Sequence, residues 1–234
     1  MLIHICIRHC LPINIDRKGI NMEQNMIKVP AKANSAINLK VLPGHFATSH
    51  SHISQYVDMT TLKSRLSEAT LAANVLAQKY SSSTFVDTIV CMDGCEVIGS
   101  FMAERLTQQG IMSVNTHKTI SVVTPEIHTN GQLIFRDNLQ PMIKDRHIVL
   151  LIASATTGMT IEQSLKCLEY YGGIVEGISA IFSASHEVDG HEIDSIFTAD
   201  DLDNYQTYAV MECPMCAAKQ KLDGIVNGYG YSRL

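Results

Sequence analysis

Short apolar runs alternate with stretches of helical periodicity along most of this chain. Buried strands are predicted at 85–91, 119–123, 148–153 and 174–184, where apolar and β-branched residues follow one another. Amphipathic helices are predicted at 60–80, 97–109 and 161–173, where apolar residues recur every three or four positions. Strands that alternate with helices are typical of an α/β fold, so we expect a central parallel sheet flanked by helices.

The loop between the run at 148–153 and the helix that follows is rich in small and hydroxyl-bearing residues. It reads Ser154, Ala155, Thr156, Thr157, Gly158, Met159, Thr160. A strand, a tight loop and a helix N-terminus bring free N–H groups and the positive end of the helix dipole to one place, where a phosphate can bind. An ordinary βα turn with threonine as N-cap is the alternative.

Composition narrows the class of protein. The chain has 234 residues, 46% of them hydrophobic and 18% charged, with a net charge of −5, which is typical of a globular protein and argues against a nucleic-acid-binding role. No apolar run is long enough to cross a membrane, and residues 1–15 lack the pattern of a signal peptide. Seven cysteines at scattered spacings indicate a reducing compartment, so we expect a cytoplasmic protein.

The segment from Val149 to Thr160 resembles the phosphoribosyl-diphosphate (PRPP) motif of type I phosphoribosyltransferases. The resemblance implies a type I phosphoribosyltransferase-like fold, a central parallel sheet flanked by helices with a small hood, in which residues 154–160 bind a 5′-phosphate. That family has two adjacent acidic residues that bind the ribose hydroxyls. The matching positions here are Ile152 and Ala153, so the phosphate half of the motif is present and the ribose half is missing.

Residues 41–58 resemble the N-terminal hood of orotate phosphoribosyltransferases, with Gly44-His45-Phe46, a Ser-rich turn and Tyr56-Val57-Asp58. The chain is accordingly divided into an extension (1–27), an N-terminal hood (28–60), a phosphoribosyltransferase-like core (61–185) and a C-terminal hood or tail (186–234). His50 and His52 are either a solvated pair in a loop or ligands of the site.

The resemblance also implies a loop that holds diphosphate after the strand at 85–91, formed here by Asp93, Gly94 and Glu96. Two carboxylates repel a diphosphate unless Mg²⁺ lies between them. Either these residues help to hold Mg²⁺, or the loop no longer receives diphosphate. The family's mobile catalytic loop corresponds to residues 126–144, where His128 and Arg136 are the candidate catalytic residues, because a departing diphosphate needs positive charge beside it.

Cys213-Pro214-Met215-Cys216 supplies half of a tetrahedral zinc site. The other two ligands are expected from Cys6 and Cys10, from histidines, or from a second copy in a dimer. A Cys-Pro-x-Cys near the C-terminus also occurs in some orotate phosphoribosyltransferases, so the motif is alternatively inherited without a metal. Cys6-x-x-x-Cys10, with His4 and His9, is a weaker candidate for metal binding.

Two main functions follow. The resemblance implies transfer of a phosphoribosyl group from PRPP to a pyrimidine base such as orotate, with Mg²⁺ and in a homodimer. The missing acidic pair and the lack of a lysine in the loop at 126–131 favour instead a regulatory protein that binds PRPP or a nucleoside monophosphate without turnover. A metal-stapled interaction protein built on Cys213 and Cys216 is a third possibility. The base and the true start of translation, with Met22 and Met26 as further candidates, stay open.

Overall fold

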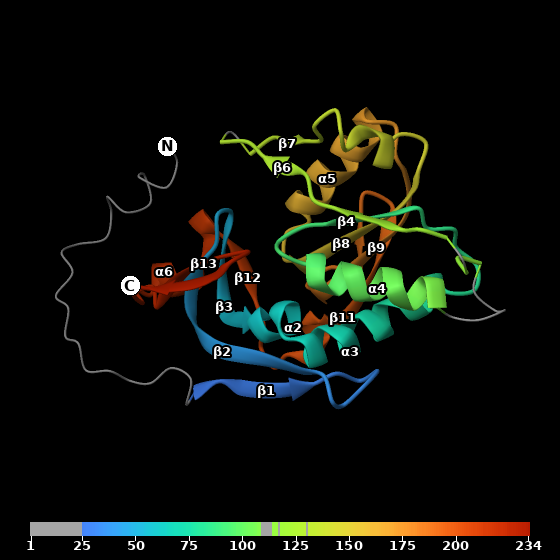
Figure 1. Ribbon diagram of the computed structural model, residues 1–234. Helices are drawn as coiled ribbons and strands as arrows, with labels where there is room; N and C mark the ends of the chain where they lie inside the picture. Colours follow the sequence, from blue (N-terminus) through green and yellow to red (C-terminus); the bar gives the residue numbers. More distant parts are fainter. Residues whose placement is uncertain (1–24, 109–113, 117, 130) are drawn as a thin grey trace.

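The computed structural model describes residues 25–108, 114–116, 118–129 and 131–234 (Figure 1). Its core is a six-stranded sheet in the order β10-β11-β9-β8-β4-β5. The strands are β4 (Thr88–Cys91), β5 (Ser121–Val123), β8 (His147–Ala155), β9 (Ile174–Ser183), β10 (Glu187–Val188) and β11 (His191–Thr198). All neighbours pair in parallel except β10 and β11. The predicted α/β class with a central parallel sheet is therefore confirmed.

Alternate residues of β8 face the two sides of this sheet. Val149, Leu151 and Ala153 belong to one hydrophobic cluster, together with helices α3 (Leu66–Ala77) and α4 (Glu96–Gln108). Ile148, Leu150 and Ile152 belong to the other, together with α5 (Met159–Tyr170). Because both faces of the strand are covered, its sequence is continuously apolar, as in other parallel sheets.

A second six-stranded sheet, which we call the hood sheet, combines residues from both ends of the described chain. Its strands are β1 (Ile27–Pro30), β2 (Asn38–Ala47), β3 (Ser51–Asp58), β12 (Thr207–Ala209), β13 (Gly224–Asn227) and β14 (Gly230–Arg233). The path is β12-β3-β2-β13-β14, and β1 pairs with β2. Figure 1 shows these blue and red strands gathered beside the core, where helix α2 (Thr60–Ser64) leads from one part to the other.

The predicted helix at 60–80 is wrong in one respect, because it is not continuous. Helix α2 ends at Ser64, and the extended backbone of Arg65 (φ −92°, ψ 122°) separates it from α3. A 3₁₀ turn, η2, follows α3 at Gln78–Tyr80. Leu66, which the periodicity placed on the apolar face, is 67% exposed. The other apolar positions of the pattern are buried. The closely packed face of α3 consists of Leu76 and of small residues that let the helix approach its neighbours, Ala69, Ala72, Ala73 and Ala77.

The predicted strand at 85–91 is shorter than expected. It begins at Thr88, and Phe85 is half-exposed, with the ammonium of Lys118 lying 4.5 Å from its ring centroid. A turn at Asp189-Gly190 joins β10 and β11, with positive φ at both residues. An acidic run, Asp200-Asp201-Leu202-Asp203, follows β11. Asp201 caps the 3₁₀ turn η4 (Ala199–Asp201) by accepting a hydrogen bond from the Thr198 backbone N–H at 2.8 Å.

The remaining elements are short. They are the hairpin β6 (Glu126–Ile127) and β7 (Leu133–Ile134), the 3₁₀ turns η3 (Gln140–Met142) and η5 (Val210–Glu212), and helix α6 (Pro214–Ala217). No helix in the described ranges has the length and apolar character needed to span a membrane. Residues 1–24, with the candidate ligands Cys6 and Cys10, lie outside the described residues, as do residues 109–113.

Candidate functional site

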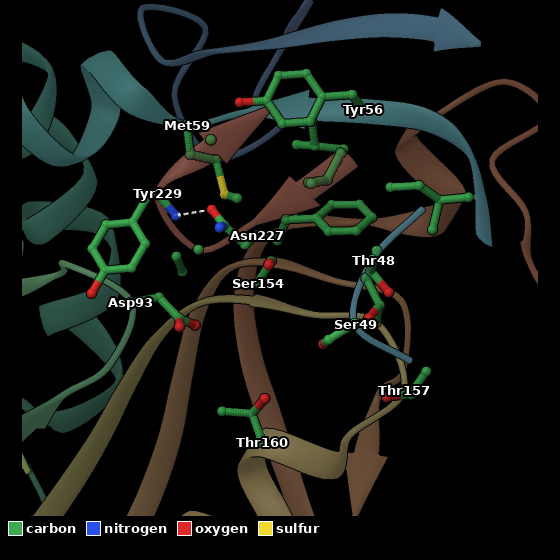
Figure 2. Close-up of a pocket in the computed structure, with 18 of the residues that line it drawn as sticks. Thr48, Ser49, Tyr56, Met59, Asp93, Ser154, Thr157, Thr160, Asn227 and Tyr229 are labelled. Atoms are coloured by element: carbon green, nitrogen blue, oxygen red, sulfur yellow. Dashed lines mark hydrogen bonds between the residues drawn. The ribbon is translucent and has the colours of Figure 1, made fainter. Parts of the chain in front are cut away.

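A cavity of about 210 Å³ lies where the carboxyl ends of the core strands meet the hood sheet. Open α/β sheets bind their ligands at this edge. The core contributes Asp93, Ala153, Ser154, Thr156, Thr157 and Thr160 to the lining. The hood and α2 contribute Thr48, Ser49, His50, Tyr56, Lys63, Asn227, Gly228 and Tyr229, among others. Figure 2 shows polar side chains from both parts around one space.

The predicted phosphate loop forms the floor of this cavity. Strand β8 ends at Ala155, and α5 begins at Met159. The N–H groups of the first helical turn have no acceptor within the helix, and no side chain caps the N-terminus of α5, whose N-cap residue is Gly158. The hydroxyl-bearing residues Thr156, Thr157 and Thr160 line the cavity at the same place. The arrangement supplies donors and the positive end of a helix dipole, which suits a phosphate dianion.

The backbone path of this loop depends on Gly158. Its φ is +77°, a conformation that only glycine adopts without strain. A Cβ built on it would lie 2.8 Å from Cγ2 of Val188 on β10. Both the backbone conformation and the close approach of β10 therefore require glycine here.

The carboxylate that lines the cavity comes from Asp93, in the loop between β4 and α4. Burial raises the pKa of Asp93, the nearby ammonium of Lys63 lowers it, and Glu96 adds a smaller raising effect; the net direction is upward. Lys63 Nζ donates to the carbonyl oxygens of Asp93 and Gly228, both at 2.7 Å. Lys63 thus joins the core loop to the β13–β14 turn at the edge of the cavity.

The positions where the resembled family carries its acidic pair are apolar in structure as well as in sequence. Ile152 is buried on the α5 side of the sheet, and Ala153 faces the cavity. Strand β4 pairs with β8 through Cys91 and Leu151, and the loop after each strand reaches the cavity, where Asp93 and Ala153 both line it. A carboxylate that follows the neighbouring strand therefore lines the same cavity as the position that lacks one.

The structure places the other predicted site residues elsewhere. Glu96 begins α4, and its carboxylate accepts a hydrogen bond from Thr124 Oγ1 at 3.0 Å, outside the cavity lining. His128 lies in the turn between β6 and β7, Arg136 follows β7, and neither lines the cavity. Arg136 makes a two-pronged ion pair with Glu126, at 2.6 and 2.8 Å, and this contact lowers the pKa of Glu126.

Several residues of this site were not predicted from the sequence. Lys63, Asn227 and Tyr229 lack a local motif, because they reach the cavity from α2 and from the last hairpin of the hood sheet. The exposed ring of Tyr229 stands at the rim (Figure 2), where its backbone N–H donates to Asn227 Oδ1 at 2.9 Å. An aromatic ring at the rim of a cavity can pack against a base, but neither the exposure of Tyr229 nor its place beside the phosphate loop can be read from the sequence.

A second constellation lies within the hood, away from the phosphate loop. His45, His52, Cys213 and Cys216 bring one nitrogen or sulfur atom each to within 4.8 Å of one another. The cysteines were predicted as a half-site, and histidines were among the candidate partners. His52 had been weighed as a ligand, whereas His45 was not singled out. Burial, together with nearby His45, lowers the pKa of His52, which favours the neutral ring.

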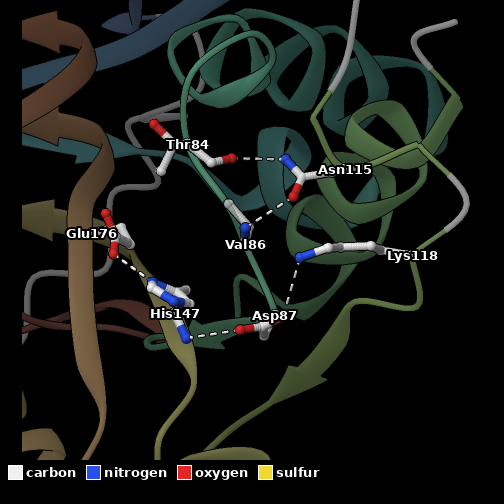
Figure 3. Close-up of polar contacts among 7 residues, drawn as sticks. All are labelled: Thr84, Val86, Asp87, Asn115, Lys118, His147 and Glu176. Atoms are coloured by element: carbon white, nitrogen blue, oxygen red, sulfur yellow. Dashed lines mark hydrogen bonds and ion pairs between the residues drawn. The ribbon is translucent and has the colours of Figure 1, made fainter. Parts of the chain in front are cut away.

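A further group of polar side chains lies at the opposite, amino ends of the core strands (Figure 3). The Asn115 side chain accepts from the Val86 N–H and donates to the Thr84 carbonyl, both at 2.9 Å. His147 contacts Glu176 at 2.6 Å through its side chain and Asp87 at 3.1 Å through its backbone N–H. These groups satisfy one another's hydrogen bonds, so we assign them a structural role.

No protein-family model matches this chain, and a comparison with curated proteins gave no match. Among solved structures, it is similar to orotate phosphoribosyltransferase of Mycobacterium tuberculosis H37Rv in complex with Fe(III) dicitrate, with 12% identity and a TM-score of 0.49 over 70% of this chain and 91% of that one. It is also similar to orotate phosphoribosyltransferase of Aeropyrum pernix, with 21% identity and a TM-score of 0.49 over 68% of this chain and 88% of that one. The third such structure is adenine phosphoribosyltransferase of Leishmania donovani, with 15% identity and a TM-score of 0.47 over 76% of this chain and 89% of that one.

Proposed function

We propose that this protein is phosphoribosyltransferase-like and binds a small ligand with a 5′-phosphorylated ribose, either PRPP or a nucleoside monophosphate. The observation that carries the proposal is the loop at 154–160, which lines the cavity with hydroxyl-bearing residues at an uncapped helix N-terminus. The sequence of that loop resembles the PRPP motif, and its place at the carboxyl edge of a parallel sheet agrees with that reading.

The remaining lining suggests how the rest of such a ligand would lie. With its phosphate on the threonine loop, the ribose would lie beside Ala153, within reach of the Asp93 carboxylate. A base would extend toward the hood, where Tyr56 and Tyr229 offer aromatic rings. Asp93 would take over part of the hydrogen bonding that the missing acidic pair supplies in the resembled family.

The reaction we propose is transfer of the phosphoribosyl group from PRPP to a pyrimidine base such as orotate. A ring nitrogen of the base bonds to C1 of the ribose as the bond from C1 to the diphosphate oxygen breaks, and diphosphate leaves. Bound Mg²⁺ would neutralise charge on the diphosphate. Of the two carboxylates in the predicted diphosphate loop, that of Asp93 lines the cavity and would face the ion. The carboxylate of Glu96 instead accepts a hydrogen bond from Thr124. The proposed assembly, by the same resemblance, is a homodimer.

Two observations favour the alternative, a protein that binds such a ligand without turnover. Residues Ile152 and Ala153 supply no carboxylate to the ribose. The cationic side chain predicted for the leaving diphosphate, that of Arg136, is paired with Glu126 away from the cavity. Lys63, the lysine that lines the cavity, donates to two backbone carbonyls. A leaving diphosphate without a cation directed at it keeps a high barrier to transfer.

A coupled measurement tests the proposal and separates these alternatives. The purified protein is titrated calorimetrically with PRPP and Mg²⁺, and diphosphate is then assayed after addition of orotate, with uracil and adenine as comparison bases. Saturable PRPP binding with base-dependent release of diphosphate supports the enzyme. Binding of orotidine 5′-monophosphate without PRPP binding or diphosphate release supports the regulatory protein. If neither ligand binds, the proposed function is wrong.

A further inference from the structure

Four potential metal ligands from distant parts of the sequence meet at one point of the hood. His45 is on β2, and His52 is on β3. Cys213 is the N-cap of α6, and Cys216 lies within that helix. We propose that these four side chains bind one Zn²⁺ ion, which fastens the C-terminal segment to the β2–β3 hairpin. The site is distinct from the phosphate loop, and its existence does not depend on the proposed function.

The distances between the ligand atoms match the edges of a small tetrahedron. His45 Nε2 lies 3.0 Å from His52 Nδ1 and 3.5 Å from Cys213 Sγ. Cys216 Sγ lies 3.7 Å from His45 Nε2 and 3.2 Å from His52 Nδ1. Typical Zn–N and Zn–S bond lengths give tetrahedral edges of about 3.3 Å for N–N and about 3.6 Å for N–S. These four separations differ from the ideal edges by a few tenths of an ångström, and all four ligand atoms lie within 4.8 Å of one another.

The ring of His45 is oriented as a ligand. Its Nδ1 lies 3.1 Å from the carbonyl oxygen of Gln220, which can accept only from a protonated nitrogen. That contact places the proton on Nδ1 and leaves the lone pair of Nε2 facing the other three side chains. A backbone carbonyl that fixes the tautomer of a ligating histidine is a common outer-shell partner of zinc.

The backbone around His45 is held on both sides. Its N–H donates to Asp223 Oδ2 at 2.8 Å, and its carbonyl accepts from the Asp223 N–H at 2.7 Å. The segment that carries Gln220 and Asp223 directly follows α6, so the same stretch of chain provides the cysteines and the supports of His45. Both the backbone and the ring of His45 are therefore held in place by the segment that follows the cysteines.

Burial and charge also suit a zinc ion. His45, His52 and Cys213 are buried, while Cys216 is exposed and leaves a path for an ion to enter. Two thiolates offset the charge of Zn²⁺, so a neutral unit is buried rather than a net charge. Four protein ligands leave no open position for substrate, which is typical of a structural rather than a catalytic zinc site.

The first test is the metal content of the full chain. The protein, purified under reducing conditions with zinc supplied, is expected to carry one Zn²⁺ per chain by elemental analysis. Cys216→Ser is the informative variant, because the exposed position tolerates serine and a correctly folded chain can be checked by circular dichroism. We expect Cys216→Ser to lose the ion. The matched control Cys167→Ser changes a cysteine on α5, outside the cluster, and is expected to retain it.

Cobalt substitution tests the ligand set without any mutation. Co²⁺ in the site is expected to give the intense visible bands of a tetrahedral ion and a thiolate-to-cobalt charge-transfer band. The proposal is overturned if the wild-type chain binds no zinc, if Cys216→Ser keeps a full equivalent, or if the cobalt spectrum lacks thiolate bands. A thiol titration that finds Cys213 and Cys216 joined in a disulfide in the zinc-treated protein would overturn it as well.

Discussion

Lys63 on α2 donates a hydrogen bond at 2.7 Å to the backbone carbonyl of Asp93, at the carboxyl end of β4. The same ammonium donates to the carbonyl of Gly228 in the β13–β14 turn. One side chain thus connects the core sheet, the interrupted helix and the hood sheet around the cavity. The break in the helix at Arg65 separates the short helix that carries Lys63 from α3.

We expect Lys63→Met to loosen the cavity while leaving the apolar stem of the side chain in place. Two hydrogen bonds from a charged donor are lost, which should destabilise the fold by about 1–3 kcal/mol in chemical denaturation. Ligand affinity should fall with it, because the Asp93 loop and the β13–β14 turn lose their connection. Lys79→Met, which removes a lysine from the exposed ion pair with Glu192, is the matched control. Equal stability of the two variants would contradict this role of Lys63.

Replacement of the Asp93 carboxylate should affect stability and binding in opposite directions. The pKa of Asp93 in the folded protein is raised from its ordinary value of 3.8, chiefly by burial. The charged form therefore costs stability above the raised pKa, and this cost disappears as the pH falls toward 3.8. Asp93→Asn should have a higher melting temperature than wild type at neutral pH, with the difference shrinking in acid. Asparagine also tolerates the positive φ of 54° at this position.

The same Asp93→Asn variant should bind a ribose-containing ligand more weakly, since an amide is a poorer acceptor for ribose hydroxyls than a carboxylate. The effect should be larger for orotidine 5′-monophosphate than for inorganic phosphate, which has no hydroxyls to lose. A uniform loss for both ligands would place Asp93 away from the ribose.

Gly158→Ala should destabilise the phosphate loop in two separable ways. The left-handed backbone alone costs roughly 1–2 kcal/mol for a residue with a Cβ, and the Cβ would also lie 2.8 Å from Val188 Cγ2. A double-mutant cycle with Val188→Ala removes the steric contact and leaves the backbone strain. We expect Gly158→Ala to cost less in the Val188→Ala background, with the backbone cost of roughly 1–2 kcal/mol remaining. Full rescue would mean that the backbone conformation matters little.

Arg136 offers a test of turnover. If the β6–β7 hairpin closes over the ligand, Arg136→Gln should slow diphosphate release and leave the affinity for orotidine 5′-monophosphate unchanged, because that product lacks the diphosphate. Glu126→Gln is the paired variant, since it frees Arg136 from its ion pair and should retain turnover. Unchanged turnover in Arg136→Gln would remove this residue from the proposed catalytic machinery.

The sequence predicted the core well where burial on both faces dictates the composition. The run at 148–153 and the helix after Gly158 lie where the apolar pattern placed them, because β8 is covered on both sides. The exposed Leu66 shows where this reasoning fails. Its spacing fits the helical face, but the chain turns at Arg65, and no local residue type marks that turn.

The sequence predicted only part of the candidate site, because it reveals contiguous motifs and not contacts between distant segments. The threonine loop is contiguous in sequence, so its motif was visible. The hood side of the cavity and the four-ligand cluster combine residues that are far apart in the sequence; His52 and Cys216, for example, are some 160 positions apart. The pairing of β2 with β13 and of β3 with β12 brings such residues together. The cysteine spacing indicated a half-site, while the partner histidines required the fold.

The most direct test of the account compares orotidine 5′-monophosphate with orotidine, the same nucleoside without its phosphate, by isothermal titration against the wild-type chain. The threonine loop predicts saturable binding of the monophosphate, loss of most of that affinity in Thr157→Val, and much weaker binding of the nucleoside. Equal affinity for the two ligands, or no binding of either, would contradict the claim that residues 154–160 hold a 5′-phosphate.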